Sequence, residues 1–328
     1  MSDTDTGPLT WIIGTGGLLG STLAAQLRRR GRDCFAPAEP WAWDQPERLS
    51  MQLRRALTSF GDRLRPGQRW EIHWSAGRAA MTSAGGELEA DRRGFQALVE
   101  SLAEGSALRG HRGLLVLASS AGGIHAASKA RWIDEQTPPE PNNPYGHWKL
   151  EQEELIRGLV AAGHADGAFI ARISTLYGVG RANSRRAGLI RTIAHQLLRR
   201  QPVKIFVPLD TMRDYIIVQD AAALILAGSE LAWGRILRGE GNRCLTRLVA
   251  SEQPTAVSEL LGIFRRLTRR QPLVLTSISG PAHLYSRCVQ YRSICQPELR
   301  QLVTTPLALG IAAVLQAERR AMARGMPR

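Results

Sequence analysis

A tyrosine and a lysine four residues apart are the side chains in this sequence best suited to acid–base chemistry. Tyr145 and Lys149 stand in the segment PYGHWKLEQE, and the pattern there predicts a helix over residues 145–162. Residues at i and i+4 share one face of a helix, so the ammonium lies beside the phenol. A neighbouring cation favours the phenolate, and the tyrosine could then accept a proton near neutral pH.

A glycine-rich turn near the N-terminus has the composition of a phosphate-binding loop. Gly14, Gly17 and Gly20 are spaced G-x-x-G-x-x-G, whereas Leu19 stands where the more general G-x-G-x-x-G has its third glycine. The turn follows the apolar run LTWIIG and precedes a helical pattern, which is the context of a dinucleotide fingerprint. Backbone N–H groups at such a helix start attract a pyrophosphate. A turn without a ligand is the weaker interpretation.

Two serines close the clearest strand pattern of the chain. The run GLLVLAS ends in Ser119, and Ser120-Ala121-Gly122-Gly123 follows. A hydroxyl at the carboxyl edge of a sheet could hydrogen-bond a reacting oxygen of a substrate. Taken alone, a Ser/Gly turn without function is the better interpretation, but the nearby tyrosine–lysine pair favours the catalytic one.

Strands alternate with helices along most of the chain, which predicts an α/β fold with a doubly wound parallel sheet and helices on both faces. We expect a Rossmann-type domain over residues 1–180 and a smaller mixed α/β domain over 181–328, with parts of 203–245 returning to the Rossmann core. The predicted strands cover residues 9–14, 33–37, 41–44, 70–75, 113–119, 167–174 and 203–207. Besides the helix after the glycine turn, the predicted helices cover residues 47–60, 87–102, 145–162, 187–200, 220–227, 256–267 and 307–324.

Length and composition exclude several classes of protein. A chain of 328 residues with 44% hydrophobic residues can bury a large core without disulfide or metal staples. Its four cysteines form no C-x-x-C pair and no zinc spacing, so we expect no metal site. The longest apolar stretch is too short to span a bilayer, and the polar start has no signal-peptide character. We expect a cytoplasmic protein with no membrane insertion.

The net charge of +14 comes almost entirely from arginine, because only three of the 43 basic residues are lysines. The arginines occur in scattered pairs, without a basic block interleaved with aromatic residues and without helix-turn-helix or zinc-finger spacing. We therefore expect no nucleic-acid partner. The charge suits an anionic small substrate.

Six segments in this order resemble the extended short-chain dehydrogenase/reductases, specifically the NAD-dependent epimerase/dehydratase group that acts on nucleotide sugars. The resemblance implies a Rossmann domain that holds NAD or NADP and a C-terminal domain that grips the nucleotide diphosphate. It also implies a homodimer through the helices over 87–102 and 145–162. The segments are GTGGLLG (14–20), EIHWSAG (71–77), LASSAGGIHA (117–126), PYGHWKLEQE (144–153), RISTLYGVG (172–180) and RDYIIVQDAA (213–222).

The resemblance assigns roles to the matching residues. Tyr145 would be the catalytic base, and Lys149 would hold the nicotinamide ribose. Arg213 would contact the substrate phosphates, since a guanidinium suits a diphosphate, with Thr175 and Arg185 as further substrate contacts. The cofactor contacts would be Gly14, Gly16, Gly17, Leu18, Leu19, Gly20, Glu39, Asp44, Ser75, Ala76, Gly77, Tyr145, Lys149 and Ile173.

The catalytic turn departs from the usual family pattern. Ala121 stands where most members carry the catalytic Ser/Thr. A variant motif, S-S-G-G-T-V-Y-G, fits residues 119–126 without a gap and makes Ser120 the working hydroxyl, with Ser119 as second choice. The related 4,6-dehydratases carry an Asp-Glu pair in this turn, which is absent here, so we expect no dehydration.

Two further departures concern the cofactor. Ala38 stands where NAD enzymes carry the acidic residue that binds the adenosine ribose, and Glu39 is adjacent. Glu39 would favour NAD by repelling a 2′-phosphate, whereas nearby Arg32 could favour NADP. Asp91 matches the family's helix asparagine.

These features favour a nucleotide-sugar epimerase, acting at C4 through a transient keto-sugar. One alternative is an NADPH-dependent 4-ketosugar reductase. Another is a cofactor-binding regulatory protein whose active site has decayed, which Ala38, Asp91 and Ala121 would fit.

Overall fold

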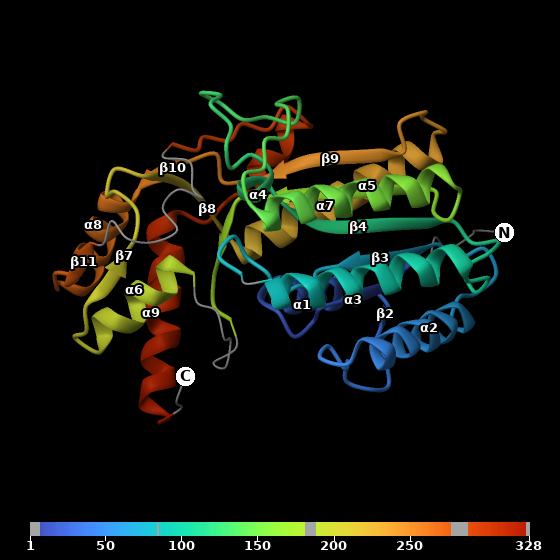
Figure 1. The fold of residues 1–328 in the computed structure, drawn as a ribbon, viewed down its shortest axis with the longest axis horizontal. Helices are drawn as coiled ribbons and strands as arrows, with labels where there is room; N and C mark the ends of the chain where they lie inside the picture. The colour runs from blue at the N-terminus through green and yellow to red at the C-terminus, as the bar shows by residue number, and fades with distance from the viewer. Residues whose placement is uncertain (1–6, 84, 181–187, 277–287, 326–328) are drawn as a thin grey trace. The chain divides into compact units, whose positions relative to one another are not determined.

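The chain forms two compact units in a computed structural model that describes residues 7–83, 85–180, 188–276 and 288–325 (Figure 1). The first unit includes Ile225–Arg247, from the second half of the chain. We had expected parts of residues 203–245 to belong to the Rossmann core. The second unit takes Ser120–Asn143, which lies within the range 1–180 that we had expected to form one domain. The first unit comprises Met1–Ser119, Pro144–Ala171 and Ile225–Arg247, and the second unit comprises Ser120–Asn143, Arg172–Leu224 and Leu248–Arg328.

The first unit is built on a six-stranded sheet with the order β2-β1-β3-β4-β5-β9. β1 pairs in parallel with β2 and β3, and β3 pairs in parallel with β4. The strand order reverses between β1 and β3, which makes the carboxyl ends of these two strands a topological switch point, where doubly wound sheets bind ligands. The strands are β1 (Leu9–Ile13), β2 (Cys34–Phe35), β3 (Trp70–Trp74), β4 (Gly113–Ser120), β5 (Gly167–Ile173) and β9 (Cys244–Val249).

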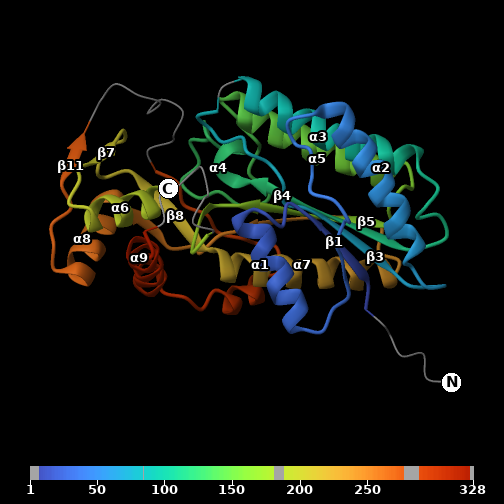
Figure 2. The same cartoon turned by 90° about the horizontal axis from the view of Figure 1, so that it is seen from below.

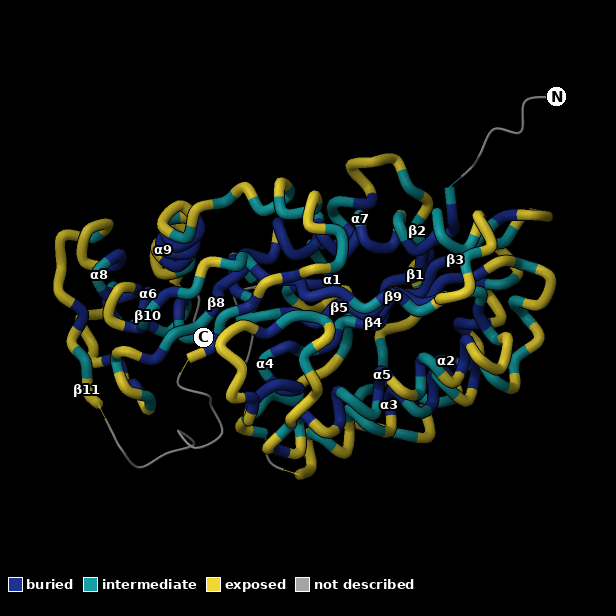
Figure 3. The backbone as a smooth tube through the Cα atoms, turned by 90° about the horizontal axis from the view of Figure 1, so that it is seen from above, coloured by how far each residue is buried: buried dark blue, intermediate teal, exposed yellow. Residues whose placement is uncertain are grey.

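Helices cover both faces of this sheet, as Figure 2 shows. One face carries α1 and α7, and the other carries α2, α3 and α5. Every residue of β1, β3 and β5 is buried, as expected for a sheet that is covered on both sides (Figure 3). The helices are α1 (Leu18–Arg29), α2 (Pro46–Asp62), α3 (Gly85–Glu104), α5 (Pro144–Ala161) and α7 (Val218–Leu237).

A row of aromatic rings joins the sheet to α3 and α5. Phe95 on α3 is fully buried and packs edge-on against Trp74 of β3, with ring centroids 5.2 Å apart, and against Trp148 of α5, at 5.8 Å. Trp43 extends the row on the other side of Trp74 at 6.2 Å. Edge-on packing adds to the stabilisation that burial of such rings provides. This row fixes the position of α5, which carries Tyr145.

The second unit contains two smaller sheets. β8 pairs in parallel with β6 and antiparallel with β10, and β7 pairs in parallel with β11. Its core joins residues of these strands to α6, α8 and α9, with Phe264 and Ile193 at its centre. The elements are α4 (Ala121–Ile124), β6 (Thr175–Tyr177), α6 (Leu189–Leu198), β7 (Val203–Ile205), β8 (Met212–Ile217), β10 (Pro254–Ala256), α8 (Val257–Thr268), β11 (Val274–Thr276), a 3₁₀ helix (Pro297–Leu302) and α9 (Leu307–Ala323).

The strand predicted over residues 41–44 is wrong, because these residues, all of them described, form a loop. Trp41 stacks on Trp11 with ring centroids 6.1 Å apart, and the Ala42 N–H donates to Gln52 Oε1 at 2.8 Å. The aromatic residues therefore anchor a loop to the core, and α2 supplies the hydrogen-bond partner that a neighbouring strand would have supplied. α7 also extends well beyond the predicted 220–227.

We expect Phe95→Ala to lower the free energy of unfolding by about 3–5 kcal/mol, since it leaves a cavity between β3 and α5. Chemical denaturation followed by circular dichroism measures this loss. Met51→Ala is the control, because Met51 on α2 is 52% exposed and its truncation should cost less than about 0.5 kcal/mol. Equal losses for the two variants would contradict the aromatic row as the support of α5.

Candidate functional site

The glycine turn is shaped by close approaches of backbone to backbone. Gly14 has φ +105°, and a Cβ there would lie 2.6 Å from the backbone nitrogen of Ala76, which follows β3. A Cβ on Gly20 would overlap the carbonyl oxygen of Gly14. Gly16 differs, since a Cβ there would meet open space. The turn thus lies at the carboxyl ends of β1 and β3 and presents Gly16 outward.

The turn leads directly into the N-terminus of α1. Gly17 is the N-cap, no side chain caps the helix, and its first turn carries no acidic residue. Leu18 and Leu19 are the first helical residues, and the Gly17 N–H donates to the Gly14 carbonyl oxygen at 2.9 Å. The N–H groups of the first turn are directed toward the same end of the sheet and can bind an anionic group. The predicted phosphate-binding residues are therefore brought together.

The loop after β3 is tied to α3 by one carboxylate. Asp91 accepts hydrogen bonds from the backbone N–H of Arg78 at 2.9 Å and of Ala79 at 2.7 Å. Gly77, with φ +142°, brings the loop so close that a Cβ there would lie 3.2 Å from Asp91 Oδ2. Asp44 pairs with Arg78 at 3.2 Å. The residue matched to the family's asparagine thus holds the loop that contains the predicted cofactor residues Ser75, Ala76 and Gly77.

The loop after β2 is organised by Gln52, a buried residue of α2. Its Nε2 donates to the Pro40 carbonyl oxygen at 3.0 Å and to Glu39 Oε2 at 3.3 Å. Arg32 lies elsewhere, because its guanidinium occupies the space where Gly7 would carry a Cβ. Gly7 precedes the amino end of β1, whereas the glycine turn follows the carboxyl end. Arg32 is therefore directed away from the ribose position that sequence analysis considered for it.

Tyr145 and Lys149 lie on one face of α5, as the spacing predicts. The Lys149 Nζ is 5.8 Å from the centroid of the Tyr145 ring. Tyr145 is half-buried, and Lys149 is 9% exposed. The ammonium donates to the Ala118 carbonyl oxygen at 3.1 Å and to Gln152 Oε1 at 3.0 Å, so β4 and α5 together fix its position.

Burial lowers the pKa of Lys149 to about 8. Desolvation disfavours the charged form, and the two neutral oxygens that accept its hydrogen bonds replace only part of its hydration. The carboxylates of Asp91 and Glu153 act in the opposite direction and raise the pKa of Lys149. Desolvation therefore outweighs the two carboxylates, and the Lys149 ammonium beside Tyr145 can lose its proton just above neutral pH.

The two serines at the end of β4 have different partners. Ser119 Oγ donates to Glu153 Oε1 at 2.7 Å, and both side chains are buried. Ser120, in the second unit, is the N-cap of α4 and accepts a hydrogen bond from the Gly123 N–H at 3.1 Å. Ala121 is fully buried in an apolar cluster of the second unit. The Ser119 hydroxyl is therefore used inside the core, whereas Ser120 accepts a bond and retains its own hydroxyl hydrogen.

The second unit carries the residues predicted to contact substrate. Thr175 is the first residue of β6 and pairs with Tyr215 of β8, the strand that also carries Arg213. Next to them, Asp214 is buried and accepts hydrogen bonds from Ser174 Oγ and from both the N–H and the Oγ of Ser251. Burial raises the pKa of Asp214 despite these bonds. Ile173 ends β5, and Arg185 lies outside the described residues.

Three polar residues that organise these regions were not among the predicted site residues: Gln52, Glu153 and Asp214. Glu153 could have been found, because it follows Lys149 by one helical turn on the same face. Gln52 acts on a segment distant from it in the sequence and carried no local signal. Asp214 lies in the segment RDYIIVQDAA, but its partners Ser174 and Ser251 are distant in the sequence, so its role did not follow from that segment. In the described part of the chain, no three His, Cys, Asp or Glu side chains gather as metal ligands. None of its described helices is both long and apolar enough to cross a membrane.

Most of the chain matches a known protein family. The profile described as "NAD dependent epimerase/dehydratase family" matches residues 10–231. A "Putative UDP-glucose 4-epimerase" of Methanocaldococcus jannaschii is 32% identical over 108 residues, which are 33% of this chain and 35% of that protein. The match thus spans about a third of that relative.

Two solved structures have a similar fold over nearly the whole chain. The UDP-glucose-4-epimerase from Stenotrophomonas maltophila with bound NAD and formylated UDP-arabinopyranose has a TM-score of 0.76 at 18% identity, covering 97% of this chain and 99% of that chain. RMD from Pseudomonas aeruginosa complexed with NADPH has a TM-score of 0.72 at 18% identity, covering 96% and 98%. These matches confirm the predicted α/β fold with a Rossmann-type parallel sheet.

We expect Lys149 to titrate with a midpoint near pH 8. Labelling lysine at the 13Cε position makes this measurable by NMR, because the chain has three lysines and the other two, Lys129 and Lys204, are exposed. One of the three resonances should move between pH 7 and 9, and Lys149→Arg should remove it. A spectrum without such a transition would contradict the buried environment of the ammonium.

Proposed function

The chain belongs to the NAD dependent epimerase/dehydratase family, and we propose that it is a nicotinamide-dependent epimerase of nucleotide sugars that inverts C4 through a transient keto-sugar. The observation that carries this proposal is the buried ammonium of Lys149 beside the phenol of Tyr145, at 5.8 Å from its ring centroid. A UDP-sugar is the proposed substrate class, supported by the UDP-glucose and UDP-arabinopyranose named for its relatives.

The glycine turn fits a dinucleotide. Gly16 leaves open space where any side chain would stand. The uncapped N-terminus of α1 offers N–H groups, and its first turn carries no acidic residue that would repel a pyrophosphate. Asp44 and the loop from Ser75 to Gly77 are proposed to border the rest of the cofactor. The chemistry that a bound nicotinamide supplies is hydride removal from the sugar carbon and its return to the opposite face.

Tyr145 is proposed to take the proton from the sugar C4 hydroxyl as the hydride leaves, and to return it later. Lys149 assists in two ways. Its positive charge favours the phenolate form of Tyr145. Of its three N–H hydrogens, two are donated to Ala118 and Gln152, which leaves the third for a ribose hydroxyl.

Ser120 is proposed to hydrogen-bond the reacting oxygen of the sugar. Its competitor, Ser119, donates its hydroxyl hydrogen to the buried Glu153 at 2.7 Å and would have to break that bond to assist catalysis. Arg213 and Thr175, on the paired strands β8 and β6, are proposed to bind the substrate, with Arg213 at its diphosphate.

NAD is proposed as the cofactor rather than NADP. Glu39 is held in the loop after β2 by Gln52, where its carboxylate would repel a 2′-phosphate. Arg32, the residue that could have favoured NADP, is directed toward Gly7 instead.

The epimerase proposal excludes dehydration for a physical reason. The residues after Ser120 are Ala121, Gly122 and Gly123, none of which can transfer a proton, and Ala121 and Gly123 are buried. Elimination of water across C5 and C6 needs such groups. The homodimer through α3 and α5, the cytoplasmic location and the division of cofactor and substrate between residues 1–180 and 181–328 stay predictions.

We expect the purified protein to convert UDP-glucose into a product of equal mass with inverted C4, detected by mass spectrometry and NMR. Tyr145→Phe should lower kcat at least about 100-fold and leave NAD affinity nearly unchanged, since the phenol acts on the substrate proton. A product lighter by one water would overturn the exclusion of dehydration. Stoichiometric consumption of NADPH on a 4-keto-sugar, with no epimerisation, would favour the reductase alternative.

We expect Gly17→Asp to abolish NAD binding while the fold is retained. Gly17 has φ −83° and ψ 170°, which any residue adopts, and aspartate is a favoured N-cap. Its carboxylate would repel the pyrophosphate at the start of α1. Calorimetry should show at least about a 100-fold loss of NAD affinity, by analogy with removal of a charge-assisted site.

Gly188→Asp is the matched control. Gly188 is also an uncapped N-cap glycine with an extended backbone, at the start of α6, and a Cβ there would meet open space. Unchanged NAD affinity in Gly17→Asp, or an equal loss in Gly188→Asp, would contradict the assignment of the phosphate-binding turn.

A further inference from the structure

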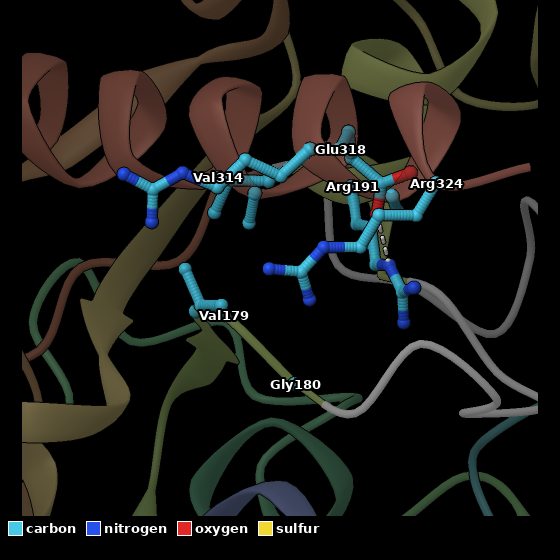
Figure 4. A pocket seen from close by; sticks show the side chains of 10 residues that line it. Val179, Gly180, Arg191, Val314, Glu318 and Arg324 are labelled. Carbon is cyan, nitrogen blue, oxygen red and sulfur yellow. Dashed lines mark hydrogen bonds and ion pairs between the residues drawn. The ribbon is translucent and has the colours of Figure 1, made fainter. Parts of the chain in front are cut away.

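A cavity of about 260 Å³ in the second unit lies between α9 and the residues that follow β6 (Figure 4). One wall is apolar and includes Val179 and Val314. The other lining side chains are charged: Arg191 of α6 and Glu318, Arg320 and Arg324 at the C-terminal end of α9. The cavity therefore combines a small apolar surface with a surplus of positive charge.

Among the described residues that line the cavity, Glu318 is the only carboxylate, and its charge is already neutralised. Arg191 Nε lies 2.6 Å from Glu318 Oε1, and His195 Nδ1 lies 3.1 Å from Glu318 Oε2. Burial acts to raise the pKa of Glu318, but the hydrogen bonds from Arg191 and His195 outweigh it and hold the pKa below its usual value. Glu318 is thus ionised and its charge is matched by that of Arg191, so it does not offset the remaining arginines.

Arg320 and Arg324 supply the surplus charge. They are one helical turn apart, at i and i+4, so both face the same side of α9. Both are exposed, and neither forms an ion pair with a carboxylate of the described residues. Figure 4 shows the Arg324 side chain extending from α9 toward Gly180. Two guanidinium groups therefore border the cavity, and the described residues supply no counter-charge to them.

The cavity is separate from the proposed diphosphate contact at Arg213. Thr175 of β6 pairs with Tyr215 of β8, and Arg213 comes two positions before Tyr215, so its level on β8 lies two residues before that pair. Gly178, the first lining residue, comes five positions after that level, or roughly 16 Å along an extended chain. Arg213 is also not among the described residues that line the cavity, so we treat the two as separate sites.

We propose that this cavity is a second anion site, which binds a phosphate group, either free phosphate or the monoester of a small metabolite. A phosphate monoester carries about two negative charges at neutral pH, which matches the two guanidinium groups that have no carboxylate partner among the described residues. Each guanidinium group can also bind two phosphate oxygens at once. At about 260 Å³ the cavity is smaller than the roughly 300–1,000 Å³ of typical ligand sites. It therefore fits a phosphate with a small body better than a complete nucleotide sugar.

A structural explanation competes with this proposal. Arginines in the last turn of a helix stabilise the partial negative charge of its carbonyl end, and Arg320 stands in the last turn of α9. Arg319 has the same charge and nearly the same distance from the helix end, but it does not line the cavity. The two explanations therefore make different predictions for these neighbours.

The test is a calorimetric titration of the full chain with inorganic phosphate and, separately, with glucose 1-phosphate, at constant ionic strength. We expect millimolar or tighter binding that weakens at least about 10-fold in Arg320→Ala/Arg324→Ala and stays unchanged in Arg319→Ala, because only the first pair borders the cavity. Tighter binding of glucose 1-phosphate than of phosphate would identify a metabolite as the ligand, and equal binding would identify free phosphate.

Two outcomes would overturn the proposal. One is phosphate affinity that is equal in the wild-type chain and in the double variant. The other is an equal loss in Arg319→Ala, which would indicate a general effect of surface charge. Thermal unfolding of the three proteins without phosphate controls for loss of α9. Because the readout is binding to the chain without substrate, its result is independent of the proposed epimerase activity.

Discussion

The first unit is organised around one buried ammonium group. Lys149 can remain charged inside the protein only if its hydrogens find acceptors, and these come from two elements, the Ala118 carbonyl oxygen of β4 and Gln152 of α5. The requirement fixes the rotation of α5 relative to the end of β4 and thereby the position of Tyr145. The negative charges that make the burial tolerable, Asp91 and Glu153, each have a second structural partner. The two carboxylates that stabilise the charge of Lys149 therefore also hold the loop after β3 and the end of β4 in place.

Local patterns were enough to predict most of the first unit. β1, β4 and α5 lie within a residue or two of the expected ranges, because long buried runs and helical periodicity leave little choice of structure. The segment over residues 41–44 failed because its apolar residues are tryptophans that pack onto Trp11 and Trp74, a contact that depends on the folded core. α7 was predicted too short, since a helix that is apolar on most sides has weak periodicity.

In the candidate site, too, contacts between residues close in sequence could be predicted, whereas contacts between distant residues could not. Tyr145 and Lys149 are four residues apart, so their proximity follows from helix geometry alone. The difference between Ser119 and Ser120 depends on Glu153, a residue 34 positions away from Ser119, and could not be read from the turn itself. Arg32 is the arginine nearest in sequence to the expected ribose position, yet its guanidinium packs against Gly7 at the other end of β1. Side-chain direction is settled by tertiary neighbours, which a motif does not contain.

The glycines of the turn after β1 are subject to two different constraints. Gly14 and Gly20 are required by contacts within the protein, because any side chain there would strike the backbone of Ala76 or of Gly14 itself. A descendant that had lost its dinucleotide would still need both of them to fold. Gly16 has no such constraint, since a Cβ there would touch nothing in the chain. The fold itself therefore places no limit on the residue at position 16, and only a ligand at this turn would require it to stay small.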